Sequence, residues 1–234
     1  MSWFTNAMSS TLGRKIMMSL TGLFLILFLT GHLVGNLQLF MLGEEGQLQF
    51  NAYAKFMTTN PAVKILSYLT YISIVAHVIY SIVLTRHNKA ARGSDSYAYE
   101  KASASSTWSS RNMGILGTIV LIFIVVHMKG FWAEMHWGGL PLDSAGNKDL
   151  HTLVVKSYTE GLDPIPGIAY ALFYVVCMGF VAFHLSHGFS SAFQTLGLNH
   201  SKYSPLIKKI GMAYAILVPI LFAAMPLYIY VMYS

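Results

Sequence analysis

The sequence predicts an all-α membrane protein in which five transmembrane helices form one bundle. Three observations predict this fold class: a composition poor in charge, five apolar segments of membrane-spanning length, and an unequal distribution of charge between the connecting segments. Of 234 residues, 55% are hydrophobic and only 10% are charged, whereas a soluble globular domain carries about 25% charged residues. The chain therefore has too little charge to cover a water-facing surface.

The remaining composition excludes several classes of function. The net charge of +6 is spread along the chain instead of forming a recognition patch, so we expect no nucleic-acid partner. The single cysteine, Cys177, permits neither an internal disulfide nor a four-thiolate iron–sulfur cluster. It lies in an apolar run and is expected in the core. Phosphate-binding glycine motifs are also missing from the sequence.

Five segments are long and apolar enough to cross the hydrocarbon layer, which takes about 20 residues as a helix. They are residues 16–40, 62–85, 112–133, 165–188 and 206–232. The first is too long for a signal-peptide core and precedes no small-residue cleavage motif. Because the connections are short, we expect residues 1–234 to form a single transmembrane domain.

Charge on the connecting segments predicts the orientation, because cytoplasmic segments carry an excess of Lys and Arg. With the N-terminus in the cytoplasm, ten cations fall inside and five outside. The inside cations are Arg14, Lys15, Arg86, Lys89, Arg92, Lys101, Arg111, Lys202, Lys208 and Lys209. Seven of the nine acidic residues fall outside. This sorting predicts a cytoplasmic N-terminus and an external C-terminus.

Four histidines lie within the first four spans, one in each: His32, His77, His127 and His184. Ionisable residues inside a membrane are costly and usually mark function. Four more histidines fall in the connecting segments or at their edges, where we expect ordinary surface positions. These are His87, His136, His151 and His200.

Helical rise predicts that these four histidines occupy two depths. His32 lies 17 residues beyond Lys15, roughly 25 Å from the cytoplasmic edge at 1.5 Å per residue, and His127 lies at about 24 Å by the same count from Arg111. The second and fourth spans run the opposite way, so His77 and His184 lie towards the inner face. The histidines therefore fall into an outer pair and an inner pair.

Two neutral imidazoles from facing helices are the ligand set of a bis-histidine b-type haem. Small residues near them, such as Gly31, Gly35, Gly130 and Gly188, would let a flat macrocycle approach the backbone. A polar stripe on the second span should face the bundle interior: Thr70, Ser73, His77, Tyr80 and Ser81. Alternatively, each histidine hydrogen-bonds a neighbouring helix. Zinc fits less well because it needs more than two ligands per layer.

With these residues in view, the sequence resembles the dihaem cytochrome b membrane subunit of succinate dehydrogenases and fumarate reductases, in the b558-type branch whose single five-helix chain carries both haems. Four short motifs carry the resemblance, in order, on the first four spans. They are Gly31-His32-Leu33-Val34-Gly35-Asn36, Ala76-His77-Val78-Ile79-Tyr80, Val126-His127-Met128 and Phe183-His184-Leu185-Ser186-His187-Gly188.

The resemblance implies two haem b groups, with His32 and His127 as iron ligands of the outer, distal haem and His77 and His184 as ligands of the inner, proximal haem. It also implies a bacterial cytoplasmic (inner) membrane location and two partners on the cytoplasmic face, a flavoprotein subunit and an iron–sulfur subunit. Succinate and fumarate chemistry would belong to those partners. This chain would anchor them and pass electrons to or from a quinone, menaquinone in this branch.

Further site residues are assigned as candidates. His187, Arg14, Lys15, Arg86 and Arg111 are candidate partners of the haem propionates, although the four cations also suit lipid head groups and His187 also suits an ordinary helix-end position.

Quinone chemistry near the distal haem has three candidate residues: Asn36, Lys129 and Glu134. Glu134 lies seven residues after His127 and would share its face of a regular helix, although it also suits an interfacial carboxylate. Some electrogenic members of the resembled family are thought to use a carboxylate two residues before the fourth-span ligand. That position is Ala182 here, so the resemblance does not extend to a proton relay along this helix.

Three other functions remain open from the sequence. A dihaem anchor of another dehydrogenase, of the formate dehydrogenase or hydrogenase type, would use the same histidines. A small transporter would use them as a proton relay. A haem-free anchor would only dock a dehydrogenase.

Overall fold

The structure, a computed structural model, describes residues 6–7, 9–92 and 108–234, and for residues 91–92 the backbone alone. Lys101 of the orientation argument lies outside the described residues. Five helices are long and apolar enough to cross a membrane, as predicted: Thr11–Phe40, Pro61–Ala90, Met113–Trp137, Gly167–Thr195 and Ser204–Tyr233. Each extends the predicted segment by a few residues at one end or both, although the third begins one residue later and the fourth two residues later.

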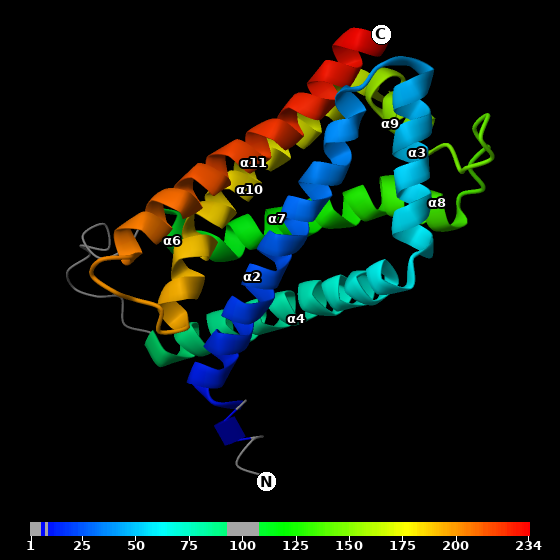
Figure 1. Ribbon diagram of the computed structural model, residues 1–234. Helices are drawn as coiled ribbons and strands as arrows, with labels where there is room; N and C mark the ends of the chain where they lie inside the picture. Colours follow the sequence, from blue (N-terminus) through cyan, green and yellow to red (C-terminus); the bar gives the residue numbers. More distant parts are fainter. Residues whose placement is uncertain (1–5, 8, 93–107) are drawn as a thin grey trace.

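The long helices are drawn in chain order in Figure 1 as α2, α4, α7, α10 and α11. Their bounds are Thr11–Asn36, Pro61–Arg92, Met113–His127, Gly167–Thr195 and Ser204–Tyr233. The short 3₁₀ helix η1 (Leu37–Phe40) continues α2, while a single π-helical turn, η2 (Met128–Ala133), and then α8 (Glu134–Trp137) continue α7. The smaller elements are α3 (Gly43–Thr59), α6 (Trp108–Arg111), α9 (Leu150–Thr159), β1 (Gly161–Leu162) and β2 (Ile165–Pro166).

The helix starts carry recognisable local signals. The Ser10 side chain caps α2 by accepting from the Gly13 N–H at 3.0 Å, and the Asn60 side chain accepts from Ala62 before α4. Pro61 opens α4 and Pro205 lies in the first turn of α11, where proline's missing N–H costs nothing. These signals mark the starts of α2, α4 and α11.

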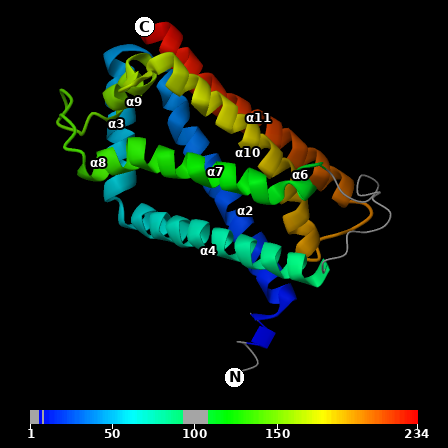
Figure 2. The same cartoon turned by 180° about the vertical axis from the view of Figure 1, so that it is seen from behind.

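The helices α10 and α11 pack along one another (Figures 1 and 2). A Cβ built at Gly211 would lie 2.5 Å from the Phe189 ring, so the absence of a side chain there allows this approach. Leu33, Tyr158, Tyr174, Val218 and Ile229 belong to one buried apolar cluster that joins α2, α9, α10 and α11.

The two ends of the bundle differ in charge. One end, which we call the basic end, gathers the start of α2, the end of α4, α6 and the α10–α11 connection (Figure 1). The opposite end, the acidic end, gathers α3, α8, α9, the β1–β2 hairpin and the C-terminus. All seven acidic residues in the described part of the chain belong to the acidic end: Glu44, Glu45, Glu134, Asp143, Asp149, Glu160 and Asp163.

The predicted polar stripe on α4 is confirmed. Thr70 is 2% exposed, and Ser73, His77, Tyr80 and Ser81 are half-buried. Apolar residues that alternate with the stripe or flank it are exposed: Ile65, Leu69, Ile72, Val75, Ile79 and Ile82. An apolar face this extensive suits contact with lipid. Cys177 is buried, as expected.

The acidic end contains a buried polar network that the sequence analysis did not anticipate. Asn51 of α3 is fully buried and donates to Asp143 at 3.1 Å and to Asp149 at 2.9 Å, while accepting from the His151 N–H at 2.9 Å. Burial opposes ionisation of Asp149, but hydrogen bonds from Thr152, Asn51 and other groups outweigh it and lower the pKa of this carboxyl. Through this network α3 is fastened to the start of α9.

Candidate cofactor site in the bundle

The first pair of histidines joins α2 to α7. The imidazole rings of His32 and His127 lie 5.8 Å apart between centroids, with their planes at 90°. His32 lies one turn before the end of α2, and His127 is the last residue of α7. The pair therefore lies towards the acidic end.

The second pair joins α4 to α10. The rings of His77 and His184 lie 6.2 Å apart between centroids, at 65°. The two pairs in the structure are the same two pairs that the rise per residue predicts from the sequence. The His32–His127 pair comes from two helices that run towards the acidic end, and the His77–His184 pair comes from two helices that run away from it.

Three helices each contact both histidine pairs. The residue spacing along each helix therefore gives the distance between the two pairs. On α2, Thr21 bonds His77 (Oγ1 to Nδ1, 3.2 Å) and lies 11 residues before His32. On α7, Gly117 faces His184, ten residues before His127, and on α10, Tyr174 contacts His127, ten residues before His184. At 1.5 Å per residue, each helix places the layers about 15–16 Å apart.

Aromatic rings surround the His32–His127 pair. Phe28 stacks on His32 at 5.5 Å and 16°, and Phe222 approaches the same ring at 5.7 Å. His127 has three aromatic neighbours, at centroid distances of 5.8, 5.4 and 6.1 Å respectively: Phe123, Phe131 and Tyr174. The surroundings of this pair are consequently aromatic and apolar.

Small and hydroxylated residues surround the His77–His184 pair. A Cβ at Gly22 would lie 3.3 Å from His77 Cε1, and one at Gly117 would lie 3.8 Å from His184 Cε1. Thr21 contributes its hydroxyl on the same side as Gly22. The backbones of α2 and α7 thus approach this pair directly.

The spacing of the rings fits bis-histidine haem ligation. Two in-line metal–imidazole bonds of about 2 Å place the ring centroids about 6 Å apart, which both pairs match. Each pair brings together two imidazoles, one from each of two helices. Nδ1 of His127 and Nδ1 of His184 are buried with no hydrogen-bond partner in the described structure.

The candidate propionate partners lie on the side of the His77–His184 pair nearer the basic end. Arg14 is half-buried on α2, whereas Lys15, Arg86 and Arg111 are exposed on α2, α4 and α6. His187 is half-buried on α10, one turn beyond His184. Their position agrees with propionate binding and with lipid head-group binding alike.

The candidate quinone residues lie beyond the His32–His127 pair, and the structure brings only one of them close to it. The Asn36 amide donates to the His32 carbonyl at 2.8 Å and lies 3.4 Å from His32 Nδ1. Lys129 is exposed on the π turn. Between His127 and Glu134 a π turn closes i to i+5, so the angular register expected of a regular helix does not apply to this pair.

Several residues near the pairs escaped the sequence analysis. The π turn directly after His127 has no recognised sequence signal, and Tyr170 and Tyr174 lie in a predicted span without any feature that singles them out. His151, expected at the surface, is 4% exposed between Phe50 and Tyr233. Burial lowers the pKa of His151, partly offset by the nearby Asp149 carboxylate.

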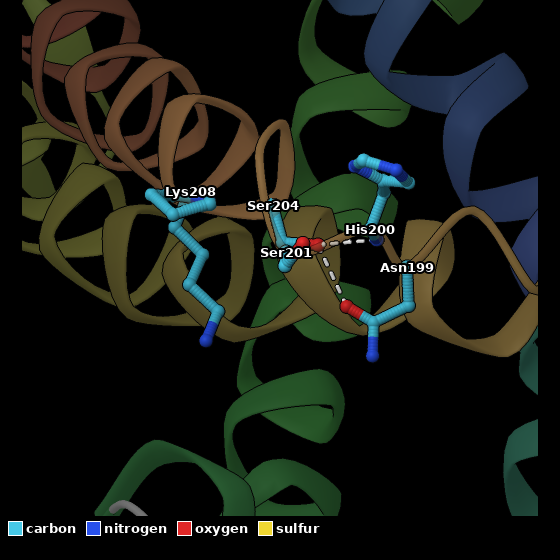
Figure 3. Close-up of a pocket in the computed structure, with 6 residues that line it drawn as sticks. Asn199, His200, Ser201, Ser204 and Lys208 are labelled. Carbon is cyan, nitrogen blue, oxygen red and sulfur yellow. Dashed lines mark hydrogen bonds between the residues drawn. The ribbon is translucent and has the colours of Figure 1, made fainter.

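A surface cavity of about 400 Å³ lies apart from both pairs, at the α10–α11 connection (Figure 3). His200, Ser201, Ser204 and Lys208 line it with Asn199, whose side chain accepts from the Ser204 hydroxyl at 2.7 Å. None of the predicted site residues contributes to it. The cavity is therefore separate from the candidate cofactor site.

Scans against protein-family models, curated proteins and solved structures each found no match to this chain. The assignment of function accordingly depends on the histidine geometry and on the motifs that carry the family resemblance.

Proposed function

We propose that this chain is a dihaem cytochrome b subunit of a succinate:quinone oxidoreductase, which anchors the complex in the membrane and conducts electrons between an iron–sulfur partner and a quinone, menaquinone in the resembled branch. One observation carries the proposal: four histidines of an apolar bundle meet as two pairs, with ring centroids 5.8 and 6.2 Å apart. Two layers of paired imidazoles are the donor set of two b haems.

In this proposal His32 and His127 hold the distal haem, and His77 and His184 hold the proximal one. When bound, the haems supply one-electron redox centres. The protein would hold the four ligand rings and surround the His32–His127 pair with aromatic side chains. Thr21 sets the orientation of the His77 ring through Nδ1, a contact of the kind that fixes the tautomer of a ligating histidine.

The charge on the two ends supports an orientation for the complex. The basic end would face the cytoplasm of a bacterial cell and dock the iron–sulfur and flavoprotein subunits. Quinone would react near the opposite end, beyond His32, where Asn36, Lys129 and Glu134 lie. Electrons would then cross the bundle through the two layers.

Substitution of single histidines tests the ligand assignment. His184→Leu and His77→Leu should each remove the proximal haem from the purified protein and leave the distal haem spectrum in place. His32→Leu and His127→Leu should do the reverse. His87→Leu, at an exposed position, is the matched control and should retain both haems. Loss of the distal haem alone from a His77 variant would show that the pairing is wrong.

Co-purification separates the proposed complex from its nearest alternatives. Mild detergent extraction should yield succinate dehydrogenase activity together with this chain. Formate dehydrogenase or hydrogenase activity in that fraction would assign the same cytochrome to another complex. A haem-free chain that carries protons in vesicles would instead favour the transporter.

A further inference from the structure

The π turn η2 begins at the residue after His127, and two tyrosines of α10 lie against it. Tyr174 places its ring 6.1 Å from the His127 ring. Tyr170 places its hydroxyl 3.0 Å from the position that a Cβ on Gly130 would take, and no other heavy atom lies within 4 Å of that position. The two tyrosine hydroxyls lie 3.2 Å apart and share one hydrogen bond.

These four residues form a closed arrangement between two helices. His127 and Gly130 are three residues apart on the α7–η2 segment, and Tyr170 and Tyr174 are four apart on α10, so each tyrosine meets one of the two. Both tyrosines are at most 5% exposed. Buried hydroxyls in apolar surroundings rarely give up their partner, and this fixes both side chains.

We propose that the Tyr170–Tyr174 pair is a clamp that positions His127. Tyr174 lies beside the imidazole as a tilted neighbour at 6.1 Å and 56°, while the Tyr170 hydroxyl fills the space at Gly130 in the π turn that follows. The clamp thereby maintains the 90° angle between the planes of His32 and His127. This inference depends on the proposed function, because a held ring angle matters only where the ring is an iron ligand.

The clamp belongs to one layer only. His184 lies on the same helix as both tyrosines, yet the residues found against its ring are His77 and Gly117. A change in the clamp should therefore alter one haem and spare the other. That selectivity distinguishes positioning of a ligand from a general loss of packing.

Paired variants of the purified, haem-loaded protein test the clamp. Gly130→Ala drives a Cβ towards the Tyr170 hydroxyl, and Gly130→Ala combined with Tyr170→Phe removes the atom it meets. The angle between two axial imidazole planes controls the g anisotropy of low-spin ferric haem. We expect Gly130→Ala to shift the largest g value of the distal haem in electron paramagnetic resonance, and the double variant to move it back towards the original position.

Tyr174→Leu, which removes the ring contact, should shift the same signal towards a smaller g value as the imidazole planes relax from 90°. Gly179→Ala, where a Cβ meets nothing within 4 Å, and Tyr228→Phe, whose hydroxyl bonds the Phe40 carbonyl at 3.0 Å, are the controls and should shift neither signal. The spectrum of the His77→Leu protein assigns the distal signal.

The outcomes separate the two proposals. A wild-type protein without haem overturns the proposed function. Two haems whose signals stay unchanged in Gly130→Ala and Tyr174→Leu overturn the clamp alone. Equal shifts of both signals, or no recovery in the double variant, also contradict it.

Discussion

The amide of Asn51 holds together three groups at the acidic end. It links two carboxylates and the His151 backbone, and it is fully buried. Asn51→Leu preserves approximate volume but removes every one of these bonds. Each buried group left without a partner costs about 1–3 kcal/mol, so we expect a lower thermal unfolding midpoint in detergent. Gln49→Leu, on the exposed face of α3, should change it little; equal midpoints would contradict the assigned role of Asn51.

Because His151 is buried at the same end, we predict that the stability of the protein depends on pH. Its folded-state pKa lies below the ordinary value of 6.5, chiefly through burial. The unfolded chain therefore binds the proton more readily, and stability falls as pH drops through 6.5 towards the folded pKa. His151→Phe should flatten the decline of the unfolding midpoint between about pH 7 and pH 5. Parallel pH profiles for the two proteins would exclude this contribution.

At the scale of the element, the contact between α10 and α11 depends on one glycine. Gly211→Ala places a Cβ 2.5 Å from the Phe189 ring, and overpacking of this kind costs about 1–3 kcal/mol. We expect a lower unfolding midpoint, with partial recovery when Phe189→Leu is added. Gly114→Ala, where a Cβ meets nothing within 4 Å, serves as the control. A midpoint unchanged by Gly211→Ala would mean that the two helices separate at no cost.

The long helices were predictable from the sequence, whereas the connecting elements were not. Length and hydropathy suffice for spans such as Pro61–Ala90. By contrast, α3 and α9 are short amphipathic helices, and tertiary bonds such as those of Asn51 stabilise them. The π turn of η2 has no recognised sequence signal, and a count for a regular helix from His127 to Glu134 does not hold across it.

At the scale of the whole molecule, the histidine pairs follow from helical rise alone, because rise is nearly constant along membrane helices. Their surroundings do not follow from it. Phe28 and Phe222 come from helices far apart in sequence and meet at His32 only in the folded bundle. The sequence therefore predicted which histidines share a layer, but not which layer is enclosed by aromatic rings.

Orientation is also a property of the whole molecule and has a direct test. In a Cys177→Ser background, Lys156→Cys at the acidic end should react with a membrane-impermeant maleimide in intact cells with an accessible outer face. Lys208→Cys at the basic end should react only after lysis. The reverse pattern would place the basic end outside and contradict the proposed docking face.

Haem content tests the central claim most directly. The pyridine haemochromogen spectrum of the purified wild-type chain should give two b-type haems per polypeptide, one for each histidine pair. A value of one would show that only one layer binds haem, and a chain without haem would contradict the account.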